Sequence, residues 1–446
     1  MATTYLSRTP ASAGSRTTWT FSAWIKRANT STTGHQIFDC SPTPGTDESK
    51  IYFYNDFLYW KQEVGGGGAD GYLVTNRKFR DVSAWYHIVC QWNTTDATDS
   101  ERMKIWINGV QETSFSTNNL PDQNRESFIN SANAHYIGSA QGTGSNFDGQ
   151  MTHVHFIDGT AYDADTFGET DATTGIWKPK TTPSVTYGTN GFFLKFENSG
   201  AFGTDSSGNG NTFTVNGTMT QTIDTPSNVF ATFNALNQQS SISYSNGNTT
   251  FTNSSSANRM AFSNLGVTKG KYYAEIKVGA ISNYMRIGIA DISKYIPVTN
   301  AYLTNISNSA NYSNDGVIFI GSSSQGTFST FTTNDIVNIA LDMDNGYVYF
   351  GKNGTWQNSG DPTSGGSGTG GFAISNYLTE TYCFGLSSFD GGTDNVANAN
   401  FGNGYFGTTA VSSAENPDDG IGIFEYAVPT GYKALCTKSI NAQEYD

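Results

Sequence analysis

The feature that most constrains this sequence is the alternation of apolar and polar residues with a period of two. Alternating runs occupy residues 19–26, 50–60, 85–92 and 103–111, and clusters of Gly, Asn, Asp, Ser and Thr separate them. Such alternation places apolar side chains on one face of a β-strand, and the intervening residues are those favoured in turns. The period of 3.6 residues that indicates helices is nearly absent. We therefore predict an all-β fold.

Three Asn-Gly pairs lie between alternating runs: Asn108-Gly109, Asn345-Gly346 and Asn353-Gly354. Both residue types tolerate the positive φ angles that a type I′ hairpin turn requires. Each pair therefore predicts a tight β-hairpin.

The charge balance restricts the partners of this chain. Lys and Arg number 24 against 38 Asp and Glu, which gives a net charge of −14. Binding to nucleic acid depends on Lys and Arg side chains that neutralise phosphates, so no nucleic-acid partner is expected. No run approaches the roughly 18 apolar residues of a membrane span, so no membrane insertion is expected. Residues 1–8 lack the apolar core of a secretory signal, so secretion by that route is not expected either.

The length of 446 residues suggests about three units, or two large β domains with a connector, at roughly 150 residues per domain. We expect a first domain over residues 1–180 and a partly ordered connector with a few strands over 181–236, where Pro, Gly and Asn interrupt the alternation. A second domain is expected over 237–408. Residues 409–446 are expected to form a tail packed on that second domain.

Several strand sequences resemble known β-sandwich families. In the first domain, FSAWIKR, WYHIVCQWN, MKIWINGVQ, YIGSA and FDGQMTHVHFIDGTAYDADTF resemble the laminin-G-like, concanavalin-type lectin sandwich. In the second, GKYYAEIKV, MRIGIAD, IVNIALDMDNGYVYFGKNGTW and YCFGLSS resemble a SPRY domain. Both resemblances imply an antiparallel β-sandwich of the jelly-roll type.

The pairing of these two domains resembles virion proteins of marine bacteriophages. That resemblance implies a tail-fibre, appendage or head-decoration subunit, made in the host cytoplasm and located in the virion. The implied partners are other virion proteins and host cell-surface carbohydrate, and a homo-oligomer is expected. A purely structural subunit, which holds virion neighbours without touching the host, remains an alternative.

Concanavalin-type sandwiches also include glycosidases, whose retaining members need two carboxylates about 5 Å apart. The Glu-x-Asp-x-x-Glu run of laminarinase-like enzymes is missing from the sequence. Asp342 and Asp344 have the spacing of one strand face, but Asp344 directly precedes a turn, and Glu275 stands alone. We therefore predict no catalytic residue and a non-enzymatic protein. A polysaccharide depolymerase, whose scattered carboxylates converge in the fold, is the alternative.

No metal site is predicted. The four cysteines are far apart, and Cys90 shares an apolar strand face with Ile88 and Trp92, so we expect a buried thiol. His153 and His155 could lie on one strand face, but no third ligand is nearby, and we expect both to face solvent. The loop 205–211 offers oxygen ligands, which leaves calcium open as a cofactor, although an Asx-type turn is the preferred interpretation.

The aromatic run at residues 52–60 supplies the candidate ligand-binding residues. Tyr and Trp combine an apolar ring with a polar tip, which suits sugars and protein interfaces. The candidates are Tyr54, Tyr59 and Trp60. The alternative is that these rings fill the core on both sides of a turn at Asn55-Asp56.

Overall fold

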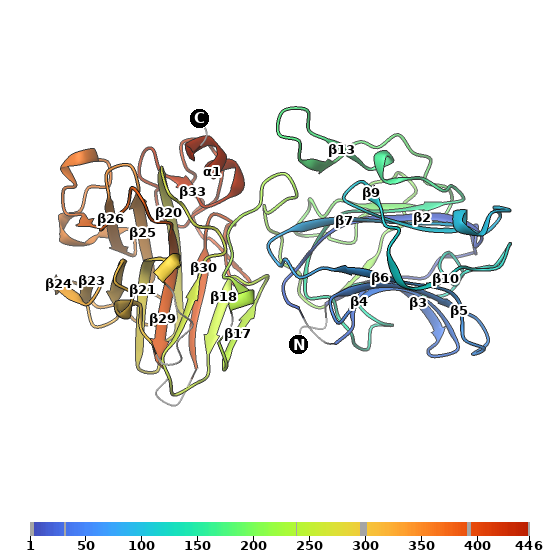
Figure 1. The fold of residues 1–446 in the computed structure, drawn as a ribbon, viewed down its shortest axis with the longest axis horizontal. Coiled ribbons are helices and arrows are strands. Elements are labelled where there is room, and N and C mark those ends of the chain that lie inside the picture. The colour runs from blue at the N-terminus through green and yellow to red at the C-terminus, as the bar shows by residue number, and fades with distance from the viewer. Residues whose placement is uncertain (1–3, 31–32, 238, 295–300, 390–393, 445–446) are drawn as a thin grey trace. The chain divides into compact units, whose positions relative to one another are not determined.

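The computed structural model describes residues 4–30, 33–237, 239–294, 301–389 and 394–444. The chain forms two compact units, each built from β-sheets (Figure 1). Unit 1 comprises Met1–Gln221 and Thr225–Ser227, and unit 2 comprises Thr222–Asp224 and Asn228–Asp446. The predicted all-β fold is confirmed. Over the described ranges, no helix has both the length and the apolar character needed to cross a membrane.

Unit 1 contains two large antiparallel sheets. The strands of sheet 1, in spatial order, are β10 (Phe115–Asn119), β6 (Ala69–Lys78), β5 (Phe57–Glu63), β4 (Asp47–Tyr54), β3 (His35–Thr43), β11 (His135–Ile137), β1 (Tyr5–Arg8) and β16 (Thr214–Asn216). Those of sheet 2 are β15 (Phe192–Leu194), β12 (Gly149–Asp158), β2 (Thr18–Arg27), β7 (Trp85–Asn93), β8 (Met103–Ile107) and β9 (Val110–Gln111). A two-stranded sheet pairs β13 (Gly168–Thr170) with β14 (Trp177–Pro179).

The core of unit 1 lies between sheets 1 and 2, as expected for a sandwich. Ile88, Cys90 and Trp92 alternate along β7 and are fully buried in this core, so the predicted buried thiol of Cys90 is confirmed. Trp19 from β2 stacks on Trp92 with ring centroids 6.0 Å apart. The alternation in the sequence therefore selects the face of each strand that is removed from water.

The segment 181–236 differs from the expected connector. β15 pairs with β12, and β16 pairs with β1, so both strands extend the sheets of unit 1. Phe192 and Phe213 from this segment are buried in the same core. A few strands were expected in this segment, but strands of three residues are too short to show an alternating pattern, so the sequence did not reveal that they join the sheets of unit 1.

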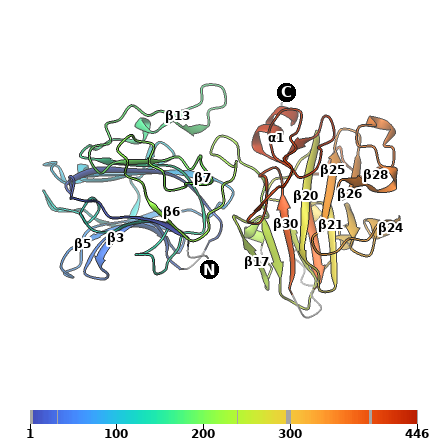
Figure 2. The same ribbon diagram turned by 180° about the vertical axis from the view of Figure 1, so that it is seen from behind.

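Unit 2 also contains two large sheets (Figure 2). The strands of sheet 3, in order, are β17 (Ile242–Ser245), β18 (Thr250–Asn253), β30 (Asn395–Asn400), β20 (Lys271–Ala280), β25 (Ile336–Asp342), β26 (Tyr347–Lys352) and β27 (Thr355–Trp356), with β28 (Phe372–Ala373) on β26 and β33 (Lys433–Ala434) on β20. Those of sheet 4 are β19 (Arg259–Phe262), β29 (Tyr382–Phe389), β21 (Tyr284–Asp291), β22 (Ser309–Ser313), β23 (Val317–Ile320) and β24 (Ser323–Thr327). A short hairpin pairs β31 (Tyr405–Phe406) with β32 (Thr409–Ala410), and α1 spans Thr437–Glu444.

The C-terminal residues of unit 2 lie on the outer side of sheet 3. Phe424 and Tyr432 pack there against Tyr273, and β33 pairs with β20 in parallel. The carboxylate of Glu275 accepts backbone hydrogen bonds from Glu425 and Tyr426, each of 2.9 Å. This segment is therefore held by apolar contacts and by a buried acceptor.

Two of the three predicted Asn-Gly turns have the expected geometry. Both residues have positive φ at Asn108-Gly109 (51° and 83°) and at Asn353-Gly354 (48° and 79°), as a type I′ turn requires. The prediction for Asn345-Gly346 is wrong, because only Gly346 has a positive φ, of 74°. There the Gly346 N–H donates to the Asp342 carbonyl at 2.9 Å, so the connection between β25 and β26 is longer than a two-residue turn.

Candidate functional site

The outer faces of three sheets are covered by segments of their own unit. Segment 162–187 covers sheet 2 with Phe167 and Trp177, and the C-terminal residues cover sheet 3. The 3-10 turn η5 (Leu303–Asn305) covers part of sheet 4 with Leu303. Among the described residues, no buried apolar cluster covers the outer face of sheet 1 at β4, β5 and β6. This open face is the candidate site.

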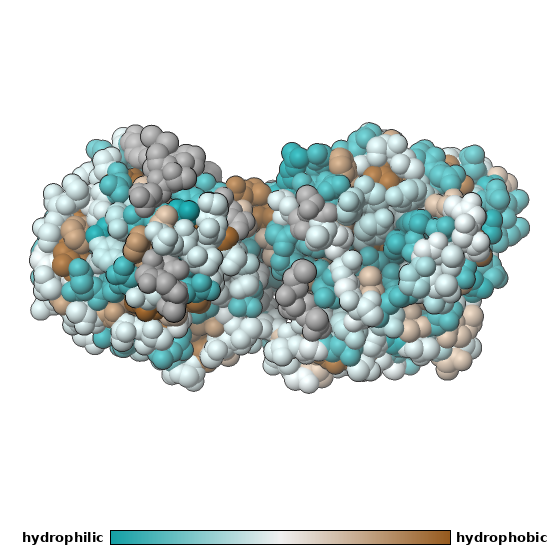
Figure 3. Space-filling model, turned by 90° about the horizontal axis from the view of Figure 1, so that it is seen from below, coloured by the Kyte–Doolittle hydropathy of each residue, from teal (hydrophilic) through white to brown (hydrophobic). Residues whose placement is uncertain are grey.

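The alternation within β4 and β5 determines which aromatic side chains reach this face. Phe53, Leu58 and Trp60 point into the core, and Tyr52 and Tyr59 point the other way. Asn55 and Asp56 form the turn between the strands, with φ of 50° and 68°. Figure 3 views the molecule from the side on which sheet 1 lies, and this surface of unit 1 is mostly teal and pale.

The structure separates the three candidate ligand-binding residues. Trp60 is 1% exposed and packs against Trp19 and Trp92, with ring centroids 5.6 and 6.0 Å away. Its prediction as a ligand-binding residue is therefore corrected, since a ligand could not reach it without unfolding the core. Tyr54 is 42% exposed and Tyr59 is half-buried, and both lie on the outer face.

Four tyrosines form a contiguous cluster on this face, which we call the tyrosine face: Tyr52, Tyr54, Tyr59 and Tyr72. Tyr59 stacks on Tyr52 with ring centroids 5.0 Å apart, and it meets Tyr54 edge-on at 5.9 Å and Tyr72 at 6.2 Å. Such contacts restrict the ring orientations before any ligand arrives. Sequence reasoning missed Tyr72. The available signal was the alternation in β6, where Tyr72 lies between the core-facing residues Gly71 and Leu73 and so points outward.

A row of paired charges borders the tyrosine face: Glu48 and Lys50 on β4, and Lys61 and Glu63 on β5. The Lys61 ammonium lies 2.7 Å from Glu48 and 2.6 Å from Glu63, and Lys50 lies 2.8 Å from Glu48. The side chains of Glu48 and Glu63 are only 5% and 8% exposed. We call these four residues the charged row.

Asp39 on β3 lies next to the charged row, since it is the cross-strand partner of Lys50. Its carboxylate accepts hydrogen bonds of 2.9 Å from Gln36 and Ser41. Burial raises the pKa of Asp39 to about 6, against the opposing effects of the Ser41 hydroxyl and of Lys50. Burial also acts to raise the pKa of Glu48, but hydrogen bonds from Lys50 and Lys61 outweigh it and lower that pKa.

This arrangement does not leave the space that a retaining glycosidase requires. In such an enzyme the reacting sugar lies between two carboxylates about 5 Å apart. Here the ammonium of Lys61 occupies the space between Glu48 and Glu63 and binds both. The face therefore offers rings, donors and acceptors to a ligand, with its carboxylates already paired.

The prediction that both histidines face solvent is wrong for His155, which is buried, whereas His153 is half-buried. His155 is 1% exposed, stacks on Phe193 at 3.9 Å and lies 2.9 Å from the Tyr187 hydroxyl. A register shift between Thr152 and His155 and a φ of 47° at His153 interrupt the alternation of β12. In the part of the chain that the structure describes, no three His, Cys, Asp or Glu side chains are grouped as a metal site requires.

Sheet 2 also brings Ser22 and His87 together, a pair that sequence reasoning did not find. Ser22 Oγ lies 2.9 Å from His87 Nε2, and the indole N–H of Trp177 donates to His87 Nδ1 at 3.0 Å. Because an indole N–H can only donate, Nδ1 is unprotonated and Nε2 carries the proton. His87 therefore donates to Ser22 and cannot take up its proton, so this pair lacks the arrangement of an activated nucleophile.

The loop 205–211 has the geometry of the preferred Asx-type turn. Asp205 Oδ1 accepts from the backbone N–H groups of Phe193 and Ser207, at 2.9 and 2.8 Å. Its Oδ2 accepts from the Ser207 hydroxyl and the Asn211 N–H, each at 2.8 Å. Both carboxylate oxygens are therefore engaged by donors, which competes with any cation.

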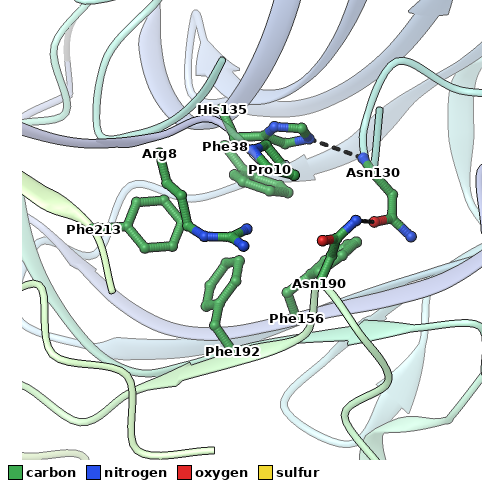
Figure 4. A pocket seen from close by; sticks show the side chains of 9 residues that line it. All are labelled: Arg8, Pro10, Phe38, Asn130, His135, Phe156, Asn190, Phe192 and Phe213. Atoms are coloured by element: carbon green, nitrogen blue, oxygen red, sulfur yellow. Dashed lines mark hydrogen bonds between the residues drawn. The ribbon is translucent and has the colours of Figure 1, made fainter. Parts of the chain in front are cut away.

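Between the two sheets of unit 1 lies a small cavity of about 10 Å³, lined in part by Arg8, Asn130, His135 and Asn190 (Figure 4). The backbone N–H of Asn130 donates to His135 Nε2 at 2.8 Å, and Asn190 donates to Asn130 Oδ1 at 2.9 Å. A cavity of this size holds about one water molecule. It is therefore too small to hold a sugar or another small-molecule ligand.

Comparison with known proteins assigns a domain type to each unit. A family model described as "Concanavalin A-like lectin/glucanases superfamily" matches residues 2–165, and the SPRY domain model matches residues 271–372. No curated protein matches the chain.

Solved structures similar to this chain include the SPRY domain of human HERC1, with 18% identity over 37% of this chain and 96% of that chain (TM-score 0.29). The heptameric SAP-like pentraxin from Limulus polyphemus has 19% identity over 36% of this chain and 72% of that chain (TM-score 0.27). Stonustoxin has 14% identity over 38% of this chain and 27% of that chain (TM-score 0.28). These values support no inference about function. From the two family matches, the chain carries an N-terminal concanavalin A-like domain and a C-terminal SPRY domain.

Proposed function

We propose that this protein is a non-enzymatic subunit of a bacteriophage particle, in a tail fibre, an appendage or a head decoration, and that it binds host cell-surface carbohydrate through the tyrosine face. The observation that supports this proposal most directly is the outward clustering of Tyr52, Tyr54, Tyr59 and Tyr72 on an open sheet face. The sequence resemblance to marine phage virion proteins supports the location, and the two binding-type domains are compatible with it.

The chemistry of the tyrosine face suits a sugar. Aromatic ring faces provide flat apolar area for the C–H groups of a sugar ring, and phenol hydroxyls provide polar contacts at the edge. Two χ angles per tyrosine keep the entropy lost on binding low, and the stacking of Tyr59 on Tyr52 reduces it further. The charged row supplies additional donors and acceptors beside the rings.

Weak binding at one site is sufficient in a particle with many copies. Linked sites raise the overall affinity by roughly 10²–10⁴ without any new contact, provided that the geometry allows simultaneous engagement. A homo-oligomer, and contacts with neighbouring virion proteins, belong to this proposal. A subunit that holds virion neighbours without host contact would use the same face for a protein partner.

One observation favours the alternative of a polysaccharide depolymerase. Asp39, with its pKa raised to about 6, and Glu48, with its pKa lowered, lie on neighbouring strands beside Lys50. Carboxylates whose pKa values are pushed apart are typical of an acid and its anionic partner. The double ion pairing of Glu48 by Lys50 and Lys61 opposes this role, so we rank it second.

The test is binding of the full chain to purified host surface polysaccharide, measured with Tyr59→Ala, Tyr59→Phe and, as a control, Tyr377→Ala in unit 2. We expect Tyr59→Ala to weaken binding about two- to tenfold, because stacking on a ring contributes about 0.5–1.5 kcal/mol. Tyr59→Phe keeps the ring and should retain most of the affinity, and Tyr377→Ala should bind like the unaltered protein. Equal binding by all four proteins would refute the assignment of the tyrosine face.

A further inference from the structure

The tyrosine face has an exposed cation at the end next to the turn Asn55-Asp56, which we call the turn end. Tyr54 and Phe57 are opposite each other across this turn, and Lys78, the last residue of β6, is opposite Phe57. The Lys78 ammonium lies 4.8 Å from the centroid of the Phe57 ring, and the lysine side chain is exposed. Directly opposed residues point to the same side of a sheet, so Lys78 shares the outer face with Tyr54.

Among the residues that the structure describes, no carboxylate pairs with the Lys78 ammonium. The two lysines of the charged row, by contrast, are both paired with its glutamates. An ammonium has three N–H donors, and the ring of Phe57 interacts only with its charge. All three donors of Lys78 are therefore available to a ligand.

Arg80 provides a second cation at the same turn. Its Nε lies 3.2 Å from Oδ2 of Asp56, and its side chain is 60% exposed. Asp56 also lies 3.3 Å from Nη1 of the buried Arg27, so one carboxylate serves two guanidinium groups. Over the described ranges, the two Nη groups of Arg80 have no hydrogen-bond partner, and they can therefore donate to a ligand.

The two ends of the tyrosine face differ in charge. At the turn end, positive side chains outnumber negative ones, since the described residues there are Arg27, Arg77, Lys78 and Arg80 against Asp56, Asp81 and Glu112. At the charged row the balance is reversed, with Lys50, Lys61 and Arg125 against Asp39, Glu48, Glu63 and Asp70. Charges more than about 8 Å apart are largely screened at physiological ionic strength, so a ligand responds to this local balance more than to the net charge of the chain.

We propose that the turn end of the tyrosine face binds the acid group of an acidic sugar, a carboxylate or a sulfate ester, through Lys78, with Arg80 as a second donor. This inference rests on the proposed function and names the class of carbohydrate. The exposed ring of Tyr54 provides the apolar surface for the acidic sugar itself. The next sugar of the chain then lies toward Tyr59, whose ring meets that of Tyr54 at 5.9 Å.

The opposite orientation of the glycan is unfavourable. At the charged row, the ammonium of Lys61 lies between Glu48 and Glu63, and an acid group of the ligand would have to compete with both carboxylates. Asp39, on the neighbouring strand, would repel an anion there. The charges therefore select the direction of the glycan on the face as well as its class.

The test applies the full chain to an array of neutral, carboxylated and sulfated oligosaccharides. We expect the acidic glycans to bind most strongly. Each carboxylated glycan should lose affinity when its carboxylate is methyl-esterified, because the ester keeps the sugar ring and removes the charge. Binding should also weaken as the salt concentration rises, since exposed charges are screened. A preference for carboxylated or for sulfated glycans identifies the acid group that the site takes.

Three variants of the full chain assign the effect to the turn end. Lys78→Gln should weaken binding of acidic glycans about two- to fivefold at low salt, as expected for an exposed ion pair, and should reduce the salt dependence. Lys78→Arg keeps the charge and should retain most of the affinity. The matched control is Lys195→Gln, which removes an ammonium that lies 5.5 Å from the ring centroid of Phe193, next to sheet 2. This control should bind like the unaltered protein.

Three results would overturn the proposal: equal binding of neutral and acidic glycans, equal affinity for a carboxylated glycan and its methyl ester, or an equal loss with Lys195→Gln and Lys78→Gln. Binding of neutral glycans alone, weakened by Tyr59→Ala, would overturn this inference and leave the proposed function standing. If no glycan of the array binds, both are refuted.

Discussion

Acidification from pH 7 to pH 5 is expected to weaken unit 1 and to spare unit 2. All five histidines of the chain lie in unit 1. Burial lowers the pKa of His87 to about 3, and burial is also the main cause that lowers the pKa values of His35 and His135 to about 4. An unfolded histidine titrates near 6.5, so the unfolded chain binds more protons than the folded unit below that pH. The stability from these neutral imidazoles is complete above pH 6.5 and is lost as the pH falls toward their folded pKa values.

The magnitude follows from the pH interval. Between pH 6.5 and pH 5, a span of about 1.5 pH units, each histidine is protonated in the unfolded chain and neutral in the folded unit. At about 1.36 kcal/mol per pH unit, each of the three histidines therefore lowers the free energy of unfolding by about 2 kcal/mol. Their combined cost is on the order of 6 kcal/mol. The raised pKa of Asp39 in the same unit offsets about 1 kcal/mol of it, because the folded carboxyl takes up its proton near pH 6. The remaining cost is comparable with the total stability of about 5–15 kcal/mol of a typical domain. Unit 1 should therefore approach its unfolding transition near pH 5.

Unit 2 should respond in the opposite direction. Burial raises the pKa of Glu275 to about 7, against hydrogen bonds from the backbone of Glu425 and Tyr426. The folded unit therefore binds more protons than the unfolded chain between about pH 4.5 and pH 7. This contribution is present in full at the acidic end of that range and is lost as the pH rises through 7. Unit 2 is thus an internal control in the same chain.

Urea titrations at pH 7 and pH 5 would measure this divergence. Trp356 is the only tryptophan outside unit 1, so tryptophan fluorescence follows mainly unit 1, and hydrogen exchange of peptides from residues 228–444 follows unit 2. We expect the fluorescence midpoint to fall strongly at pH 5, with no loss of protection in unit 2. An unchanged fluorescence midpoint would refute the reasoning about the buried histidines.

Three further predictions concern single substitutions measured by urea unfolding. Trp60→Ala should destabilise unit 1 by about 3–5 kcal/mol because it empties the core, whereas Tyr54→Ala, on the open face, should change stability by less than about 0.5 kcal/mol; similar values would contradict the assigned faces. Glu275→Gln should lower the free energy of unfolding by about 1–3 kcal/mol and increase hydrogen exchange in residues 412–436, because an amide cannot accept from every donor around this position. Unchanged exchange there would argue that Glu275 does not hold this segment. Gly109→Ala should cost about 1 kcal/mol or more, since φ is 83° and the added Cβ would lie 2.9 Å from the Trp177 ring; a neutral effect would show that the hairpin relaxes.

The period-two pattern was sufficient to predict the long strands. Runs such as β2 and β7 are long enough for the apolar face to be unambiguous, and their cores formed as expected. The positions of the short strands β15 and β16, and the sheets that they join, escaped prediction because three residues carry no measurable period, and only their partners in the sheet define them. The bulge at His153 was hidden for a related reason, since a local register shift leaves the residue types unchanged.

The candidate site was predictable only in part. The sequence showed an aromatic-rich run at residues 52–60. Whether a side chain of this run faces the core, as Trp60 does, or faces outward, as Tyr59 does, depends on the register of the strands. Tyr72 joins the cluster through the pairing of β6 with β5, which no local pattern specifies.

The central claim is that the outer face of sheet 1 binds carbohydrate without cleaving it. The most direct test incubates the full chain with host surface polysaccharide and measures, in one sample, the bound protein and the chain length of the polymer. The account predicts retention of the protein that depends on Tyr59, with unchanged polymer length and no new reducing ends. Shortening of the polymer that is abolished by Asp39→Asn or Glu48→Gln would contradict it.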